Sequence, residues 1–298
     1  MDWYKEGPNW PNRHLSRFVS LANNRWHLQQ DGTGPIILLL HGTGATTHSY
    51  AELIPELSKR FSVVAIDLPG HGFTSTLQRQ RPSLENVCAA IAELLSSESI
   101  MPDYVVGHSA GAAIAVQMTA ERMIQPRALV AINGAFFPFP GFSGQIFPAA
   151  AKLLLLNPFA PHIFAMSASN MNRLSALMDS TGSKLCNQAL KHYQSALGSA
   201  QHVEGTLAMM ANWDLKHMES KLRQLECPML QIIGGQDGTV DPQLSHRSHR
   251  LLRNGTRTVF KGCGHLVHEE QPLEMCDAIA SFVATMGSRP RSFQGALQ

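Results

Sequence analysis

The sequence is poor in charge and in cysteine. Charged residues are 15% of the 298, and the formal net charge is +2, with no long run of Lys and Arg. Such a balance gives no reason to expect a nucleic-acid partner. The five cysteines are an odd number, and no two of them have C-x-x-C spacing. This argues against a disulfide framework and against a zinc site, and it fits a reducing compartment.

Long apolar stretches are also missing. The run IILLL at residues 36–40 has five residues, whereas a membrane-spanning helix needs about 20. The N-terminal stretch MDWYKEGPNWPNRHLSRFV contains charges and prolines and lacks the apolar segment of a signal peptide. We therefore expect a cytoplasmic protein without a transmembrane segment.

Short apolar runs are present, and they predict the fold class. Strands are expected at residues 35–40, 61–66, 104–107, 128–133, 228–234 and 257–261, and the continuous apolar run at 35–40 indicates a buried strand. Segments between them have helical spacing, such as 84–94 behind a Ser83 cap, and 110–123. Alternating strands and helices predict an α/β fold with a mostly parallel twisted sheet flanked by helices.

The alternation stops between about residues 136 and 223, where we expect a helical lid insertion. Residues 136–172 contain one charged residue, Lys152, and seven of the thirteen phenylalanines. This apolar content suits the core of the lid, a large apolar substrate pocket, or a patch facing a partner or a membrane surface. The predicted organisation is a core at 1–135, the lid at 136–223, the rest of the core at 224–286 and a frayed tail at 287–298.

The segment Gly107-His108-Ser109-Ala110-Gly111 lies between a predicted strand and a predicted helix. A nucleophile elbow requires this context, because glycines on both sides of the serine permit a tight turn. The alternative is a plain glycine-rich turn. We predict that Ser109 is a nucleophile.

A serine nucleophile needs a base and a group that orients the base. His265 follows the last predicted strand and is the preferred base. His268, three residues later, is its competitor, and we interpret it otherwise as a surface residue or a residue that supports the site. Asp237 follows the fifth strand, and Asp241 precedes a proline and reads better as a turn residue. The preferred set, Ser109, Asp237 and His265, has the chain order of an α/β-hydrolase.

Acyl transfer also needs donors for a developing oxyanion. The run HGTG after the first apolar strand can supply the Thr43 backbone N–H, with Gly44 as the alternative, and the second donor would be the Ala110 N–H. Asp67 is expected to close the turn after its strand. The residues predicted to line a substrate pocket are His41, His108, Phe136 and Phe137.

The motifs HGTGAT, DLPGHGFT, GHSAG, GGQD and GCGHLVHEEQP resemble the α/β-hydrolase superfamily over the whole chain. With WPNRHLSRFV and MMANWDL, they resemble more narrowly the magnesium-chelatase accessory hydrolases encoded with bacteriochlorophyll-synthesis genes in photosynthetic bacteria. This match runs from about Trp10 to Pro272. The resemblance implies a role near magnesium insertion into protoporphyrin IX. Many members of that subfamily have a proline where Asp241 stands.

Three functions compete. The first is a serine hydrolase that assists magnesium chelatase and takes a bulky apolar ligand, for which a tetrapyrrole is the candidate. The second is a non-catalytic accessory that binds a porphyrin or chelatase subunits on the same scaffold. The third is a generic carboxylesterase, which leaves WPNR and MMANWDL unexplained. No carboxylate cluster suits Mg²⁺, so neither a metal site nor a cofactor is expected.

Overall fold

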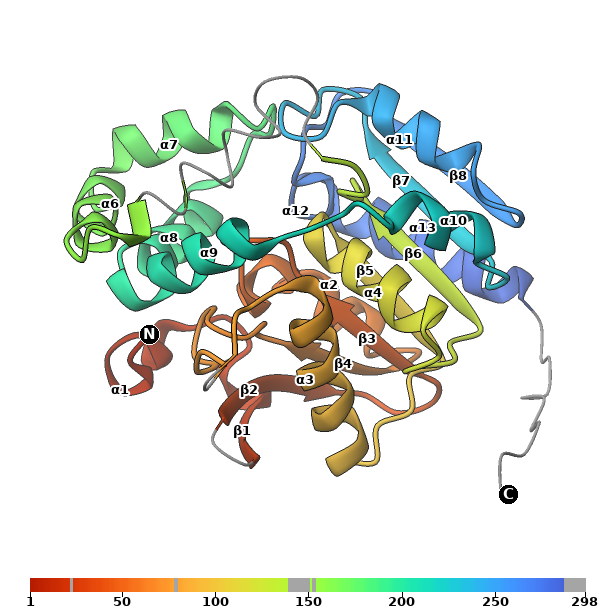
Figure 1. Ribbon diagram of the computed structural model, residues 1–298, viewed down its shortest axis with the longest axis horizontal. Helices are drawn as coiled ribbons and strands as arrows, with labels where there is room; N and C mark the ends of the chain where they lie inside the picture. The colour runs from red at the N-terminus through yellow and green to blue at the C-terminus, as the bar shows by residue number, and fades with distance from the viewer. Residues whose placement is uncertain (22–23, 78–79, 139–150, 152–153, 287–298) are drawn as a thin grey trace.

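The computed structural model describes residues 1–21, 24–77, 80–138, 151 and 154–286. Its centre is an eight-stranded sheet in the order β1-β2-β4-β3-β5-β6-β7-β8 (Figure 1). The strands are β1 (Ser16–Leu21), β2 (Asn24–Asp31), β3 (Ile36–Leu40), β4 (Ser62–Ile66), β5 (Tyr104–His108), β6 (Ala128–Ile132), β7 (Met229–Gly234) and β8 (Gly255–Phe260). Strands β3 to β8 pair in parallel, which confirms the predicted fold class.

The first two strands form an antiparallel hairpin that the sequence analysis did not predict. β1 pairs with β2, and β2 adds antiparallel to β4 at the edge of the sheet. β1 is only partly buried along its whole length. An edge strand of this kind needs no continuous apolar run, so the pattern used for the other strands could not detect it.

Helices cover both faces of the sheet. The cover on one face is α3 (Leu84–Ser97), α4 (Ala110–Ala120) and α10 (Met218–Gln224), and on the other it is α2 (Leu53–Leu57) and α13 (Pro272–Thr285). In β3, Leu38 and Leu40 pack into the first core, whereas Ile37 and Leu39 pack into the second. Successive strand residues point to opposite faces, so a strand buried on both sides is apolar at every position.

The other helices lie mainly beyond the sheet or along its edges. They are α1 (Trp3–Glu6), α6 (Ala160–Ala168), α7 (Met171–Asp179), α8 (Asn187–Leu197), α9 (Ala200–Asn212), α11 (Pro242–His249) and α12 (Val267–Glu270), with 3₁₀ turns η1 (Gly7–Asn9), η2 (Arg13–Leu15) and η3 (Thr47–Tyr50). Helices α6 to α9 follow β6 in the chain and gather at one end of the molecule (Figure 1). We call α6 to α9 with their connections the insertion. The predicted boundaries of the lid, residues 136 and 223, and its role as a lid over the sheet stay predictions.

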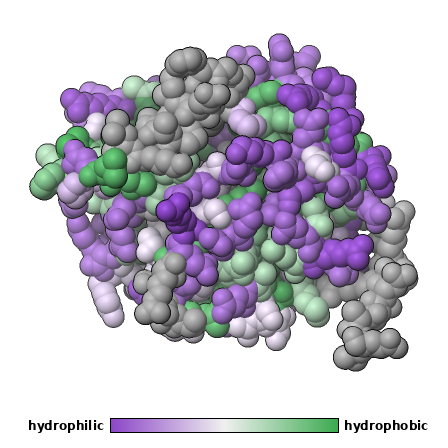
Figure 2. Space-filling model, viewed as in Figure 1, coloured by the Kyte–Doolittle hydropathy of each residue, from purple (hydrophilic) through white to green (hydrophobic). Residues whose placement is uncertain are grey.

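Part of the apolar content of the insertion is exposed. Leu156, Phe159, Ile163 and Met166 are each more than half exposed, and apolar side chains gather over α6 in Figure 2. The predictions for Phe139, Phe142 and Phe147 and for the tail at 287–298 fall outside the described residues. Among the described helices, none combines the length and the apolar character needed to cross a bilayer.

Candidate active site

The turn between β5 and α4 places Ser109 in a strained backbone conformation. Its φ is 51° and its ψ is −113°, a combination that L-residues rarely adopt. A Cβ on Gly107 would lie 2.5 Å from the Ala112 nitrogen, and one on Gly111 would lie 2.0 Å from the Leu40 carbonyl oxygen. Only glycines fit at these two positions, so the turn has the geometry that a nucleophile elbow needs.

His265 and Asp237 meet at the ends of neighbouring strands. The Nδ1 of His265, which follows β8, lies 2.8 Å from the Oδ2 of Asp237, which follows β7. The other carboxylate oxygen accepts backbone N–H bonds from Thr239 at 2.7 Å and Val240 at 2.8 Å. A carboxylate bound at Nδ1 holds that nitrogen as the donor and leaves Nε2 to take a proton, as a general base requires.

The competing residues have other partners. The Asp241 carboxylate caps α11 by accepting the Gln243 N–H at 2.8 Å, and Asp241 is exposed. His268 lies with its Nε2 2.8 Å from the Ser49 Oγ. Its side chain is fully buried, which contradicts a surface position and agrees with the alternative, a residue that supports the site from behind. The structure brings Asp237, and not Asp241, to His265.

The elbow reaches the His265 loop through His108. The His108 Nε2–H donates to the His265 carbonyl oxygen at 3.0 Å, and the two rings are 4.7 Å apart. The Ser109 hydroxyl itself donates no hydrogen bond to any described residue, His265 included. Contacts of this kind commonly tighten only when substrate is bound. The roles of Ser109, Asp237 and His265 therefore stay a proposal.

Asn133, directly after β6, is a site residue that the sequence analysis missed. Its side-chain amide donates to the carbonyl oxygens of Gly264 at 3.0 Å and His265 at 2.8 Å, and its Oδ1 accepts the Gly234 N–H at 2.7 Å. Asn133 is 1% exposed and has a φ of 44°, which Asn tolerates better than most residues. It ties the ends of β6 and β7 to the loop that carries His265.

The insertion also contacts this loop. The carbonyl oxygen of Thr181, just after α7, accepts the His265 N–H at 3.1 Å and the Gly238 N–H at 2.9 Å. A Cβ on Gly264 would lie 2.2 Å from the Gly182 carbonyl carbon, so the backbones touch directly. The insertion therefore helps to fix the loops that carry Asp237 and His265.

The run HGTG forms a tight turn beside Ser109. The Ala45 N–H donates to the Gly42 carbonyl oxygen at 3.1 Å, and a Cβ on Gly42 would lie 3.0 Å from the Ser109 Cβ. Ala110 is the first residue of α4, so its N–H has no partner within the helix. The Thr43 N–H likewise bonds to no described group. We call residues 42–45 the oxyanion turn, because this turn carries the Thr43 N–H, which together with the Ala110 N–H is a predicted oxyanion donor.

The predicted pocket residues are largely enclosed by protein. His41, His108 and Phe136 are at most 2% exposed. Phe136 packs against Gly134 in the core on the α4 side, and the partly buried Phe137 lies under the Arg247 guanidinium, 4.5 Å from it. Through these contacts the residues support the site. That the four residues line a substrate pocket stays a prediction.

The buried Asp67 carboxylate closes the turn after β4 and also bonds to two neighbouring segments. It accepts the Thr47 N–H at 2.7 Å and the Phe73 N–H at 2.9 Å, and it lies 2.8 Å from His27 Nδ1. Burial acts to raise the pKa of Asp67, but His27, His41 and the Phe73 N–H together outweigh it and hold the pKa below its usual range. Trp10, the first residue of WPNR, packs edge-on against His48 of η3. This motif thus supports the segment that follows the oxyanion turn.

A second polar network lies behind His265. The Oε1 of Glu269 accepts hydrogen bonds from Ser49 Oγ at 2.5 Å and Tyr193 OH at 2.7 Å. Burial raises the pKa of Glu269 to about 7. Burial, together with the neighbouring His265, lowers the pKa of His268 to about 3. The network is neutral at moderately acidic pH and packs against His108, whose ring is 4.5 Å from that of His268.

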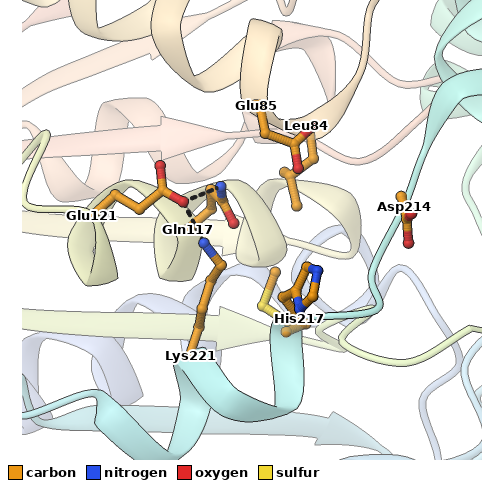
Figure 3. A pocket seen from close by; sticks show the side chains of 8 residues that line it. Leu84, Glu85, Gln117, Glu121, Asp214, His217 and Lys221 are labelled. Carbon is orange, nitrogen blue, oxygen red and sulfur yellow. Dashed lines mark hydrogen bonds and ion pairs between the residues drawn. The ribbon is translucent and has the colours of Figure 1, made fainter.

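A hollow between α3, α4 and α10 lies away from these residues (Figure 3). Its volume is about 170 Å³. The Glu121 carboxylate is held there by an ion pair with Lys221 and by the Gln117 amide at 2.7 Å (Figure 3). The Glu121 carboxylate therefore already has its bonding partners, and none of the predicted site residues lines the hollow. The candidate active site remains at Ser109.

Comparison with known proteins agrees with this architecture. The alpha/beta hydrolase family matches residues 37–278, and the chain belongs to this family. The chain is 35% identical over 263 residues to the magnesium-chelatase 30 kDa subunit of Rhodobacter capsulatus, covering 88% of this chain and 92% of that protein. It is 25% identical to the pimeloyl-[acyl-carrier protein] methyl ester esterase of Vibrio vulnificus, covering 86% of this chain and 97% of that one.

A solved structure shows the same fold at low identity. An alpha/beta hydrolase fold protein from Burkholderia ambifaria superposes with a TM-score of 0.75 at 19% identity, over 90% of this chain and 97% of that one. The family and the esterase-named relative support a hydrolase.

Proposed function

We propose that this protein is a serine hydrolase that acts as an accessory to magnesium chelatase in bacteriochlorophyll biosynthesis. Ser109 is the nucleophile, His265 the general base and Asp237 the group that orients the base. The observation that best supports this mechanism is the 2.8 Å contact between Asp237 and His265, next to the strained turn at Ser109. The pathway role is supported by the relative named as a magnesium-chelatase subunit.

The proposed reaction is acyl transfer. Ser109 Oγ attacks an ester carbonyl carbon while its proton passes to His265 Nε2, and the carbonyl oxygen becomes an oxyanion. The backbone N–H groups of Thr43 and Ala110 stabilise that oxyanion. His265 then protonates the leaving alcohol, and a water molecule releases the acid from the acyl-enzyme.

The proposed ligand is bulky and apolar, with a tetrapyrrole or its ester as the candidate, and chelatase subunits are the proposed partners. The apolar sequence of the insertion supports this choice, because apolar pockets are lined mainly by such side chains.

Complementation tests the proposal. A bacteriochlorophyll-producing host that lacks this protein receives the wild type, Ser109→Ala or Asp241→Ala, and magnesium-containing pigment and protoporphyrin IX are measured. We expect rescue by the wild type and by Asp241→Ala, with protoporphyrin IX accumulating in the Ser109→Ala strain. Equal rescue by Ser109→Ala would instead favour a binding accessory that does not use the hydrolase chemistry. Failure of the wild type to rescue would contradict the pathway role.

A further inference from the structure

His202, in α9 of the insertion, joins the oxyanion turn to the loop after β4. The Gly72 N–H donates to His202 Nδ1 at 3.0 Å, so Nδ1 carries no proton. The proton is then on Nε2, which donates to the Gly44 carbonyl oxygen at 3.1 Å. The side chain is fully buried, and burial lowers its pKa to about 4. Only the neutral ring can make both bonds.

His41 makes the matching pair of contacts on the other side of Thr43. The Leu68 N–H donates to His41 Nε2 at 2.9 Å, and Nδ1–H donates to the Gly42 carbonyl oxygen at 2.8 Å. The N–H and C=O of a trans peptide point in opposite directions, so holding the Gly42 oxygen sets the direction of the Thr43 N–H. His202 holds the Gly44 oxygen at the far end of the same turn.

Other contacts pack α9 against the oxyanion turn and the loop after β4. A Cβ on Gly205 would lie 2.0 Å from the Gly70 carbonyl oxygen, so helix and loop backbones touch. The Thr206 methyl lies 3.6 Å from the position of a Cβ on Gly44, and the Thr43 hydroxyl lies 3.9 Å from Met209 Sδ. His202, Thr206 and Met209 are spaced as one face of a helix. Met209 also begins MMANWDL, so this motif takes part in supporting the oxyanion turn.

We propose that His202 is a positioning residue through which the insertion holds the oxyanion turn in its working conformation. Its ring nitrogens bond to Gly72 and Gly44 and not to Ser109 or His265, so it acts through the Gly44 carbonyl. This inference rests on the proposed hydrolase function. The insertion is then part of the catalytic support as well as a cover, because removing His202 releases one end of the turn that presents the Thr43 N–H.

The test compares His202→Phe with His202→Gln in the full-length chain, by hydrolysis of a p-nitrophenyl ester. Loss of a whole oxyanion donor costs about 10²–10³-fold in kcat. Loosening the support of one donor should therefore lower kcat about tenfold in His202→Phe, with KM within about twofold of the wild-type value. The glutamine amide offers one acceptor and one donor, so His202→Gln should recover most of the lost kcat.

Val203→Ala is the matched control, because it trims the next buried residue of α9. Val203 packs with Ala151, Ala165 and Leu207, away from the oxyanion turn. The control should lower the melting temperature and leave kcat near the wild-type value. An equal loss of kcat in Val203→Ala and His202→Phe would overturn the proposal, because general loosening of α9 would then explain both.

Hydrogen exchange followed by mass spectrometry makes the test independent of activity. Residues 40–46 should exchange faster in His202→Phe than in the wild type and in Val203→Ala. Unchanged exchange there, or an unchanged kcat in His202→Phe, would refute the positioning role. A wild-type protein that hydrolyses no ester would refute the proposed function instead, and the exchange measurement would still decide whether His202 holds the turn.

Discussion

Mild acid should destabilise this protein because it contains several buried neutral histidines. Six described histidines are at most 3% exposed and have pKa values lowered by burial, and the five with the larger shifts are His48, His71, His108, His202 and His268, the sixth being His41. The pKa is about 4 for His202 and about 3 for His268. The ordinary value, which applies to the unfolded chain, is 6.5.

The sign and size follow from proton linkage. Each pKa is lowered in the folded protein, so the stability that these histidines contribute is present above pH 6.5 and is lost as the pH falls towards the folded values. Between pH 7.5 and 5.5 the unfolded chain gains almost one proton per histidine that the folded protein does not. For His202 and His268, with folded pKa values of about 4 and about 3, this costs about 1–2 kcal/mol each, or about 3 kcal/mol together. The lowered pKa values of His48, His71 and His108 add to the loss in the same direction.

Glu269 opposes this change. Burial raises its pKa from 4.5 to about 7, so its contribution to stability is full below pH 4.5 and is lost as the pH rises towards 7. Over the same interval Glu269 returns about 2 kcal/mol on acidification. The loss at His202 and His268 exceeds this gain, and the other three histidines add to the loss. We therefore expect a net loss of at least about 1 kcal/mol out of the ~5–15 kcal/mol that stabilises a typical domain.

Urea unfolding followed by tryptophan fluorescence measures this loss at pH 7.5, 6.5 and 5.5. In His71→Phe, the loss between pH 7.5 and 5.5 should be smaller than in the wild type, because one histidine no longer takes up a proton on unfolding. His14→Asn is the control, since His14 is exposed, and it should show the wild-type loss. A wild-type free energy of unfolding that changes by less than about 1 kcal/mol between pH 7.5 and 5.5 would refute the reasoning.

Three further predictions concern the candidate site. Asp237→Asn should lower kcat about 10⁴-fold, because it disturbs the tautomer of His265. Asp241→Ala removes a helix cap, so it should cost about 1 kcal/mol of stability and leave kcat unchanged. Equal kcat in the two variants would contradict the assignment of Asp237. Asn133→Asp keeps the side-chain shape but loses both donors, so a pH–rate profile should show lower kcat and an acid limb moved to higher pH; an unmoved profile would argue against positioning by Asn133. Gly205→Ala should cost about 1–3 kcal/mol in urea unfolding because its Cβ has no room beside α9's neighbouring loop, and wild-type stability would contradict that close approach.

The sheet and the order of the site residues were predictable from sequence for physical reasons. Strands buried on both faces are apolar at each position, as in Ile36–Leu40 and Ala128–Ile132. Parallel strands end at one edge of the sheet, so residues that follow different strands can meet there. That reasoning placed Asp237 next to His265.

The supporting residues were not predictable in the same way. Asn133 and His202 are buried polar side chains whose partners are backbone groups distant in the sequence. A sequence pattern carries no record of such tertiary contacts. The buried position of His268 likewise depends on a tertiary contact, its hydrogen bond with Ser49, and the sequence pattern around it does not show that contact.

The most direct test of the central claim is covalent labelling with a fluorophosphonate, followed by mass spectrometry of the modified peptide. We expect a single adduct on Ser109, formed by the wild type and absent from Ser109→Ala. Labelling that survives in Ser109→Ala, or an adduct on another residue, would contradict the assignment of the nucleophile. A wild-type protein that forms no adduct would contradict the proposed hydrolase itself.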